Sequence, residues 1–282
     1  MAHAMTERID AHVHVWNRAT DPQDWIDPVT MGAIARDFDT HALAGMLRAT
    51  GMERAIVVQA TNSLPESVRL AASNPASVAG LVCWVDLTGD VTAQLARIEE
   101  NARVPVVGVR HLVHTDRDPE WLLRPDVGLG LQALSARGLT FDLVVRDWQL
   151  GQAARVAAEH PDLRFVLDHL GGPFGEGADQ SVWADGIRAL ADRPNCLAKL
   201  SGLSSGFRPG TWSAEVFEPV VTTALEAFGP GRLAYGSDWP LAELGGGAGP
   251  WRETVDALVE GLSESERDGI LGGVARSAYS AA

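Results

Sequence analysis

The feature that most constrains the fold is an eightfold recurrence of short apolar, β-branched runs along the 282-residue chain. Such runs are typical of buried β-strands, and segments with helical periodicity separate them. The eight predicted strands are 9–15, 55–59, 79–85, 106–113, 139–145, 164–169, 196–202 and 233–238. Because strands that alternate with helices pair in parallel through right-handed crossovers, we predict an α/β fold, a single (β/α)₈ TIM barrel.

The segments between and after these strands carry helix caps and terminating glycines or prolines. The predicted helices are 39–51, 65–75, 119–138, 147–161, 181–194, 213–229, 251–262 and 263–278. An open doubly wound sheet is the alternative, but HVHVWN follows the first strand where that fold needs a glycine-rich phosphate loop. We expect one domain over residues 8–282 after an N-terminal tail, 1–7, of which 1–4 precede the internal Met5 and are interpreted as an addition.

Composition narrows the classes of partner. The net charge of −14 argues against nucleic acid and anionic membranes. No apolar run approaches the roughly 20 residues of a membrane span, and MAHAMTERID lacks the apolar core of a signal peptide. Cys83 and Cys196 lie in apolar runs, as buried free thiols do in a reducing compartment. We expect a cytoplasmic monomer or homodimer that acts on a small molecule.

A TIM barrel carries its active site at the carboxyl ends of its strands. Polar residues gather at these ends of the predicted strands, whereas the strand centres are Val, Leu, Ile and Ala. They are His12, His14, Arg110, His111, Asp142, Asp168, His169, Lys199 and Asp238. The sequence therefore predicts an active site at this end of the barrel.

The first strand, IDAHVHVW, alternates polar and apolar residues, which predicts Asp10, His12 and His14 on one face. Strand 8 closes against strand 1 in a barrel and should bring Asp238 beside the two histidines. Two histidines and a carboxylate form a partial ligand set for zinc or a similar divalent ion. The alternatives are a hydrogen-bonded histidine pair and, for Asp238, a helix cap or turn residue.

Hydrolysis of a carbonyl compound needs a base for water, polarisation of the carbonyl and a proton for the leaving oxygen. Asp238 is the candidate base. His169 is the candidate for orienting water, polarising the carbonyl or acting as general acid, with a turn cap as its alternative role.

Further residues are candidates for substrate binding. Arg110 offers a planar fork for a carboxylate or hydroxyls, or it pairs with a neighbouring carboxylate as scaffold. Arg110 and the adjacent His111 cannot both point inward from a regular strand. Lys199 is the single lysine, and we expect it to contact substrate or to form an ion pair, with a Schiff base as a further option. Trp16 and Trp25 accompany the long loop 17–38, where they either shape a ring pocket or hold the loop on the barrel.

Six motifs occur in order: DAHVHVW, GVRHLV, FDLVV, VLDHLGGP, KLSGL and YGSDWP. Together they resemble the amidohydrolase-related (amidohydrolase 2) TIM-barrel branch of the amidohydrolase superfamily. Within it they are most similar to sugar-acid lactonases, such as L-fuconolactonase and L-rhamnonolactonase, and to muconolactone-type hydrolases. The resemblance runs from residue 8 to about residue 240.

This resemblance implies roles for four residues. His12 and His14 match the strand-1 metal-ligand pair, and His169 matches the strand-6 histidine. Asp238 matches the strand-8 aspartate that activates water. Strand 5, TFDLVV, lacks the histidine of two-metal members. The resemblance thus implies at most one divalent ion, zinc, with metal-free catalysis as the alternative and no organic cofactor.

We therefore predict a hydrolase that opens a small polar lactone, sugar-acid or muconolactone-like, with Asp238 activating water. One alternative is a metal-dependent decarboxylase of an unsaturated or aromatic carboxylic acid, which the missing strand-5 histidine disfavours. The other is a non-catalytic small-molecule-binding barrel, which would not need a water-activating carboxylate beside His12, His14 and His169.

Overall fold

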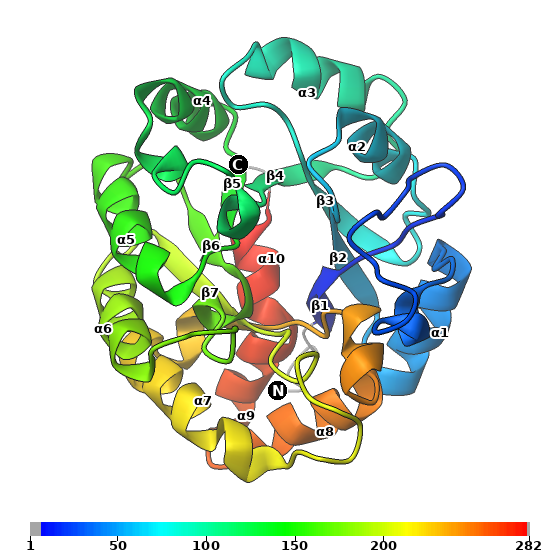
Figure 1. Ribbon diagram of the computed structural model, residues 1–282, viewed down its shortest axis with the longest axis vertical. Coiled ribbons are helices and arrows are strands. Elements are labelled where there is room, and N and C mark those ends of the chain that lie inside the picture. The colour runs from blue at the N-terminus through cyan, green and yellow to red at the C-terminus, as the bar shows by residue number, and fades with distance from the viewer. Residues whose placement is uncertain (1–6, 281–282) are drawn as a thin grey trace, which may run out of the picture.

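The computed structural model describes residues 7–280, and its centre is one sheet of eight parallel strands paired in chain order (Figure 1). The strands are β1 (Ile9–Val13), β2 (Arg54–Val58), β3 (Val78–Cys83), β4 (Val106–His111), β5 (Thr140–Leu143), β6 (Phe165–Leu167), β7 (Cys196–Leu200) and β8 (Leu233–Tyr235). All eight predicted strands are confirmed, and with them the (β/α)₈ barrel. Residues 1–6 of the expected tail lie outside the described residues, while Glu7 pairs with Arg54 on β2 at 2.5 Å.

Helices cover the outside of the sheet. They are α1 (Thr40–Thr50), α2 (Leu64–Ala71), α3 (Val91–Glu99), α4 (Pro125–Ala136), α5 (Leu150–Glu159), α6 (Gln180–Ala191), α7 (Ala214–Phe228), α8 (Ala248–Leu258), α9 (Glu264–Asp268) and α10 (Val274–Ala278). Side-chain caps start several of them. The carboxylate of Asp39, for example, accepts from the Ala42 amide at 2.8 Å.

The sequence analysis omitted α3. Its signals are present, because Asp90 caps the helix by accepting from the Ala93 amide at 2.9 Å. Val91, Leu95 and Ile98 then recur at helical spacing and are buried. The helix has nine residues, of which only three are buried apolar ones, so its periodic signal is short.

The barrel closes just beyond the last strand rather than within it. The Asp238 amide donates to the His12 carbonyl at 2.9 Å, and the His14 amide donates to the Trp239 carbonyl at 2.7 Å. Val13 and Trp239 form a parallel bridge at the same place. Closure therefore joins the histidine segment of β1 directly to the aspartate segment after β8.

Two apolar clusters fill the molecule. The larger lies between strands and helices and includes Val13, Phe141 and Trp251. The smaller contains strand residues such as Ile9 and Val58 together with residues of α10 and Tyr279. The C-terminal segment thus packs into the end of the barrel opposite the active site, and Figure 1 shows α10 crossing behind the barrel centre.

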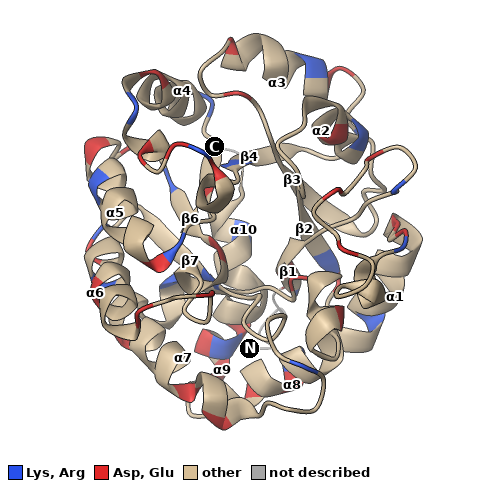
Figure 2. Cartoon of the chain, viewed as in Figure 1, with Lys and Arg blue, Asp and Glu red and all other residues tan. Residues whose placement is uncertain are grey.

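Figure 2 shows acidic and basic residues interspersed over the outer helices. Within residues 7–280, no helix combines the length and apolarity that crossing a bilayer requires.

Candidate active site

The histidine segment of β1 departs from a regular strand. The pairing of β1 with β2 shifts register between Asp10 and Val13. Ile9 and Ala11 belong to the smaller apolar cluster, while Val13 belongs to the larger one, between strands and helices. The prediction that Asp10 shares a face with His12 and His14 is therefore wrong. Its carboxylate instead accepts from the amides of Ser237, at 2.9 Å, and His12, at 3.1 Å.

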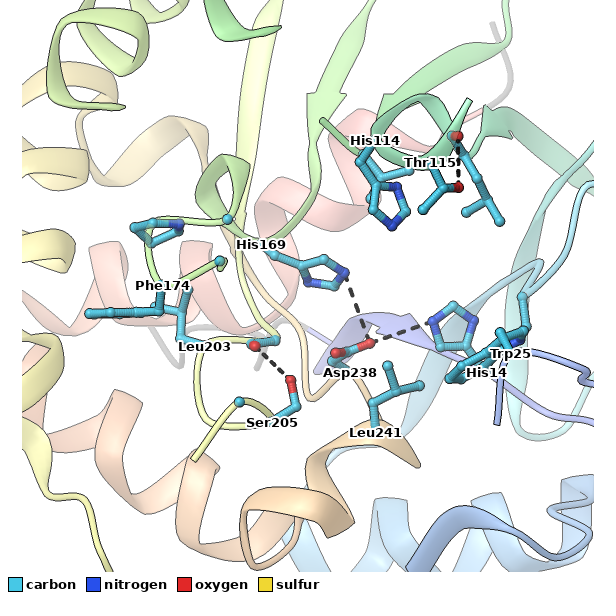
Figure 3. A pocket seen from close by; sticks show the side chains of 18 of the residues that line it. His14, Trp25, His114, Thr115, His169, Phe174, Leu203, Ser205, Asp238 and Leu241 are labelled. Carbon is cyan, nitrogen blue, oxygen red and sulfur yellow. Dashed lines mark hydrogen bonds and ion pairs between the residues drawn. The ribbon is translucent and has the colours of Figure 1, made fainter. Parts of the chain in front are cut away.

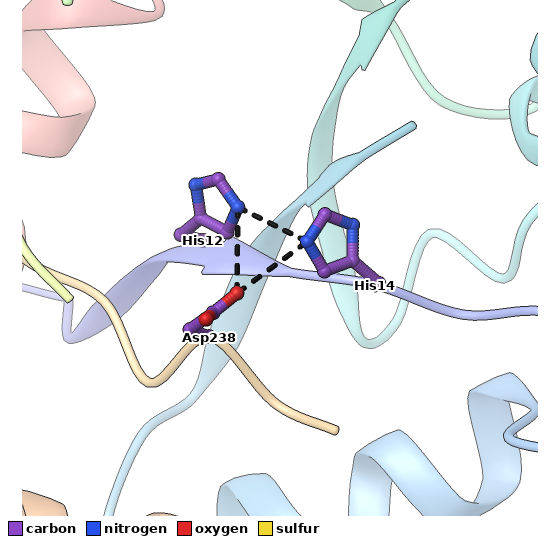
Figure 4. Close-up of side chains that lie close together, drawn as sticks. All are labelled: His12, His14 and Asp238. Carbon is purple, nitrogen blue, oxygen red and sulfur yellow. Dashed lines mark hydrogen bonds and ion pairs between the residues drawn. The ribbon is translucent and has the colours of Figure 1, made fainter. Parts of the chain in front are cut away.

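Asp238 lies against both histidines (Figure 4). Its Oδ1 is 3.7 Å from Nε2 of His12 and 3.5 Å from Nε2 of His14. The residue is 1% exposed, and within residues 7–280 this Oδ1 has no hydrogen-bond partner. A buried carboxylate oxygen without a partner is costly, so it indicates a group completed by a ligand or reacting molecule.

Backbone contacts fix the tautomer of His14. Its Nδ1 lies 2.7 Å from the Val58 carbonyl, which can only accept, so Nδ1 carries the proton. Nε2 is then a free acceptor that faces Nε2 of His12 at 3.1 Å. This arrangement, a histidine oriented by a carbonyl behind it, is typical of metal-ligating imidazoles.

His12 is held from behind by opposite charges. Its Nδ1 lies 3.2 Å from Asp168 Oδ1 and 3.1 Å from Lys199 Nζ. Burial lowers the pKa of His12 well below its ordinary value, against the opposing effect of Asp168. The imidazole is therefore neutral, as a metal ligand must be.

The three residues fit one divalent cation. The ligand atoms of His12, His14 and Asp238 are separated by 3.1, 3.5 and 3.7 Å. Ligands of a tetrahedral zinc ion at about 2.0–2.1 Å are separated by roughly 3.3 Å. The spacing, the free Nε2 of His14 and the unpartnered Oδ1 of Asp238 agree with such a site.

His169 completes the polar floor. Its backbone adopts a left-handed φ of 53°, and Asp238 has a φ of 57°, which only glycine adopts without cost. The Nδ1 of His169 lies 2.9 Å from Ser201 Oγ, and its Nε2 is 4.0 Å from Asp238 Oδ1. A methyl group on Gly202 would approach His169 Nδ1 to 2.4 Å, so the close packing requires glycine there.

Beneath this floor lies a buried charge layer, defined as Arg110, Asp142, Asp168, Lys199 and Tyr279. Lys199 Nζ is 2.6 Å from Asp142 and 2.9 Å from Asp168. Arg110 donates to Asp168 at 2.9 Å, and the Tyr279 hydroxyl donates to Asp142 at 2.8 Å. The layer ties strands β4, β5, β6 and β7 to the segment after α10.

The two carboxylates of this layer differ. Burial raises the pKa of Asp142 to about 6, with Lys199 opposing the effect. Burial acts in the same direction on Asp168, but the charges of Lys199 and Arg110 hold the pKa of Asp168 well below its ordinary value. Asp168 is therefore the fixed anion that orients His12.

A cavity of about 500 Å³ opens above the floor (Figure 3). Its polar lining includes His14, Arg110, His114, His169 and Asp238. Its apolar lining, which is more extensive, includes Trp25, Leu112, Val144, Pro173, Phe174, Leu203 and Leu241. Five of the residues predicted for the site, namely His14, Trp25, Arg110, His169 and Asp238, line it, and His12 lies directly against them.

Three residues predicted to bind substrate do not line the cavity. His111 stacks on Trp121 at 3.8 Å and pairs with Asp116 at 2.8 Å, because Arg110 takes the inward position. Trp16 is 1% exposed and donates to the Arg36 carbonyl, so it holds the loop. Lys199 is fully buried in the charge layer.

Sequence reasoning missed other residues of the site. Ser201, Gly202 and Leu203 lie in the KLSGL motif, in which only the lysine was identified as a candidate. His114 and Phe174 come from loops whose spacing carries no signal for the cavity.

Comparison with known proteins finds relatives over most of the chain. A family model described as Amidohydrolase matches residues 9–280. An L-fucono-1,5-lactonase of Burkholderia ambifaria is 34% identical over 88% of this chain and 85% of its own length. An L-fucono-1,5-lactonase of Burkholderia multivorans is 32% identical over 96% of this chain and 95% of its own length. A Burkholderia multivorans amidohydrolase crystallised with bound zinc is 31% identical and covers 97% of this chain and 99% of its own, with a TM-score of 0.86.

Proposed function

Because the chain belongs to the Amidohydrolase family, we propose that it is a hydrolase that opens a small lactone of the sugar-acid or muconolactone type. The observation that carries the proposal is the buried, unpartnered Oδ1 of Asp238, which faces three histidines at the floor of the cavity. Two relatives named as L-fucono-1,5-lactonases support a cyclic ester as substrate.

In the proposed reaction the Asp238 carboxylate takes a proton from a water molecule. The oxygen of that water attacks the ring carbonyl carbon, and negative charge develops on the carbonyl oxygen. The bond between the carbonyl carbon and the ring oxygen then breaks. The ring oxygen receives the proton held by Asp238, and the product is a hydroxy acid.

The neighbouring residues orient this exchange. His169, fixed by Ser201, directs its Nε2 towards Asp238 and the developing charge. Arg110 donates to Asp168 and to the carbonyl of Gln59, so its main part is to hold the scaffold beside His12. We assign the ring-stacking position to Trp25.

His12, His14 and Asp238 would hold one divalent ion, which we propose is zinc. Such an ion polarises a carbonyl and lowers the pKa of a water molecule when bound. The zinc-bound relative supports this assignment.

The decisive variant is Asp238→Asn, because asparagine also tolerates the left-handed backbone. We expect kcat to fall by about 10²–10⁴-fold with little change in the melting temperature. Acid release from sugar-acid lactones, followed with a pH indicator, measures the rate. Asp185→Asn, on an exposed carboxylate of α6, is the matched control and should retain full activity.

The same assay separates the alternatives. Undiminished turnover in Asp238→Asn would end the mechanism. A chelator that abolishes acid release would make the ion essential, and unchanged release would establish metal-free hydrolysis. Carbon dioxide release from an unsaturated or aromatic acid, without lactone hydrolysis, would instead identify a decarboxylase, and ligand binding without turnover a binding protein.

A further inference from the structure

We propose that the preferred lactone carries an aliphatic arm of several carbons, held against an apolar wall formed by Phe174 and Leu203. This inference rests on the proposed lactonase function and names the substituent on the ring. It follows from the size of the cavity, from the state of its polar groups and from the rigidity of that wall.

The cavity extends well beyond the reacting groups. Its volume of about 500 Å³ lies in the range of pockets that enclose drug-sized ligands, and a lactone ring alone would leave much of it unfilled. Figure 3 shows Phe174 and Leu203 on one side of His169 and Asp238, and His14 with Trp25 on the other. A ring placed over Asp238 would therefore direct one substituent towards Phe174 and Leu203.

Most polar groups around the cavity are already engaged within the protein. Ser205 Oγ donates to the Gly202 carbonyl at 2.7 Å, and Thr115 Oγ1 donates to the Leu112 carbonyl at 3.3 Å. The Trp25 indole N–H donates to the Gln23 side chain at 2.7 Å. These residues present mainly carbon to a ligand.

The terminal nitrogens of Arg110 are engaged in the same way. One donates to Asp168, and the other donates to the backbone and side chain of Gln59. Among residues 7–280, two side chains that line the cavity beyond the floor keep one buried nitrogen each without a partner, Nδ1 of His114 and Nε of Arg110. Two such groups can bind ring hydroxyls. They cannot satisfy a polyhydroxylated arm as well, whose buried hydroxyls would lose their hydrogen bonds to water.

The apolar wall is fixed in place. Phe174 packs edge-to-face on Phe207 and Phe217, with ring centroids 5.5 and 5.6 Å apart. Leu203 is 3% exposed and belongs to the main core cluster. Because this packing presents the carbon atoms of both side chains to the cavity, the wall favours apolar substituents.

The test is a series of 1,5-lactones with methyl, propyl and pentyl arms on C5, the carbon that the ring oxygen joins to the carbonyl carbon. The series is compared with a polyhydroxylated hexono-1,5-lactone. We expect kcat/KM to rise about fourfold for each methylene group that the wall buries. The propyl and pentyl lactones should exceed the polyhydroxylated one.

Two variants connect the trend to the wall. Leu203→Asn should flatten the rise of kcat/KM with arm length, and Phe174→Asn, at a less buried position, serves the same purpose if the first variant does not fold. Leu129→Asn, on an exposed leucine of α4 that is 66% accessible, is the control and should keep the full rise.

The failures of the two proposals differ. A flat or falling kcat/KM along the alkyl series, with rapid hydrolysis of the polyhydroxylated lactone, would overturn the apolar arm and leave the lactonase function standing. A rise that persists unchanged in both wall variants would also overturn the assignment of the wall. Absence of hydrolysis across all lactones would overturn both proposals.

Discussion

Two neighbouring groups of ionisable residues share the barrel and differ in how their charges are satisfied. The floor of the cavity, made of His12, His14, His169 and Asp238, contains Oδ1 of Asp238, which has no hydrogen-bond partner among residues 7–280 and faces only histidines. In the charge layer below it, Oδ1 of Asp168 also lacks a hydrogen bond, but Lys199 lies within 2.9 Å of both carboxylates and pairs with them. Asp238 is 1% exposed, and Asp142 and Asp168 are 0% and 1% exposed.

We infer from this equal burial with unequal charge pairing that the two groups have different roles. A buried carboxylate that pairs with a cation fixes geometry, since removing the cation leaves an uncompensated charge. A buried carboxylate that pairs with no Lys or Arg is available to an ion, water or substrate. The comparison predicts that the charge layer controls stability and that the floor controls turnover.

The largest effect on stability is expected from Lys199→Met, which leaves Asp142 and Asp168 without their shared cation. We expect the free energy of unfolding to fall by about 3–5 kcal/mol. Urea unfolding followed by circular dichroism measures it. Arg155→Met, which breaks an exposed ion pair on α5, is the control and should have little effect. Equal losses in the two variants would contradict the distinction.

The floor should respond to Gly202→Ala through activity. The added methyl would meet His169 Nδ1 at 2.4 Å and Asp238 Oδ2 at 3.0 Å, and φ at this residue is +67°. Displacing these side chains by about 1 Å should lower kcat about 100-fold. Gly210→Ala, in the same segment between β7 and α7, has a similar φ of +73° and open space around its position, and it should retain activity. Similar rates in both variants would show that the contact is unimportant.

Zinc should stabilise the protein by binding to residues of the floor and not elsewhere. Adding zinc to chelator-treated protein is expected to stabilise the folded state by about 2.7 kcal/mol at a concentration 100 times the Kd, seen as a rise in melting temperature. His14→Gln should remove this rise. His111→Gln, whose ring stacks on Trp121 outside the floor, should keep it. Retention of the rise in His14→Gln would place the ion elsewhere.

The smallest effect concerns His114 at the cavity edge. Burial lowers the pKa of His114 to about 4, with Arg110 acting in the same direction. The unfolded chain, with a histidine pKa of about 6.5, therefore binds more protons between pH 6.5 and 4. Stability should fall as pH decreases through this window. His114→Gln should make that loss shallower, and an unchanged profile in chemical unfolding would argue against the assignment.

The sequence was sufficient where the physical signal is local. The alternation of IDAHVHVW and the recurrence of apolar runs predicted strands, barrel and histidine pair, because strand periodicity is set within a few residues. It was insufficient where a residue far away in the sequence decides the direction of a side chain. Arg110 rather than His111 faces inward because Asp168, which directly follows β6, pairs with Arg110.

Irregular backbone accounts for the remaining differences. The register shift in β1 turns Asp10 away from the histidines, and alternation alone cannot reveal such a shift. The apolar wall comes from Phe174 and Leu203, which lie in loops where no periodic pattern fixes the direction of a side chain. Burial in a loop is decided by tertiary packing, which sequence spacing does not encode.

The left-handed backbone at His169 and Asp238 has a consequence for laboratory evolution of this enzyme. A non-glycine residue in that conformation costs about 1–3 kcal/mol, which glycine avoids. A library selected for heat resistance alone should therefore enrich His169→Gly and Asp238→Gly and accumulate robust but inactive proteins. Selection that couples heat challenge to lactone turnover would retain both side chains and direct stabilising changes to the outer helices.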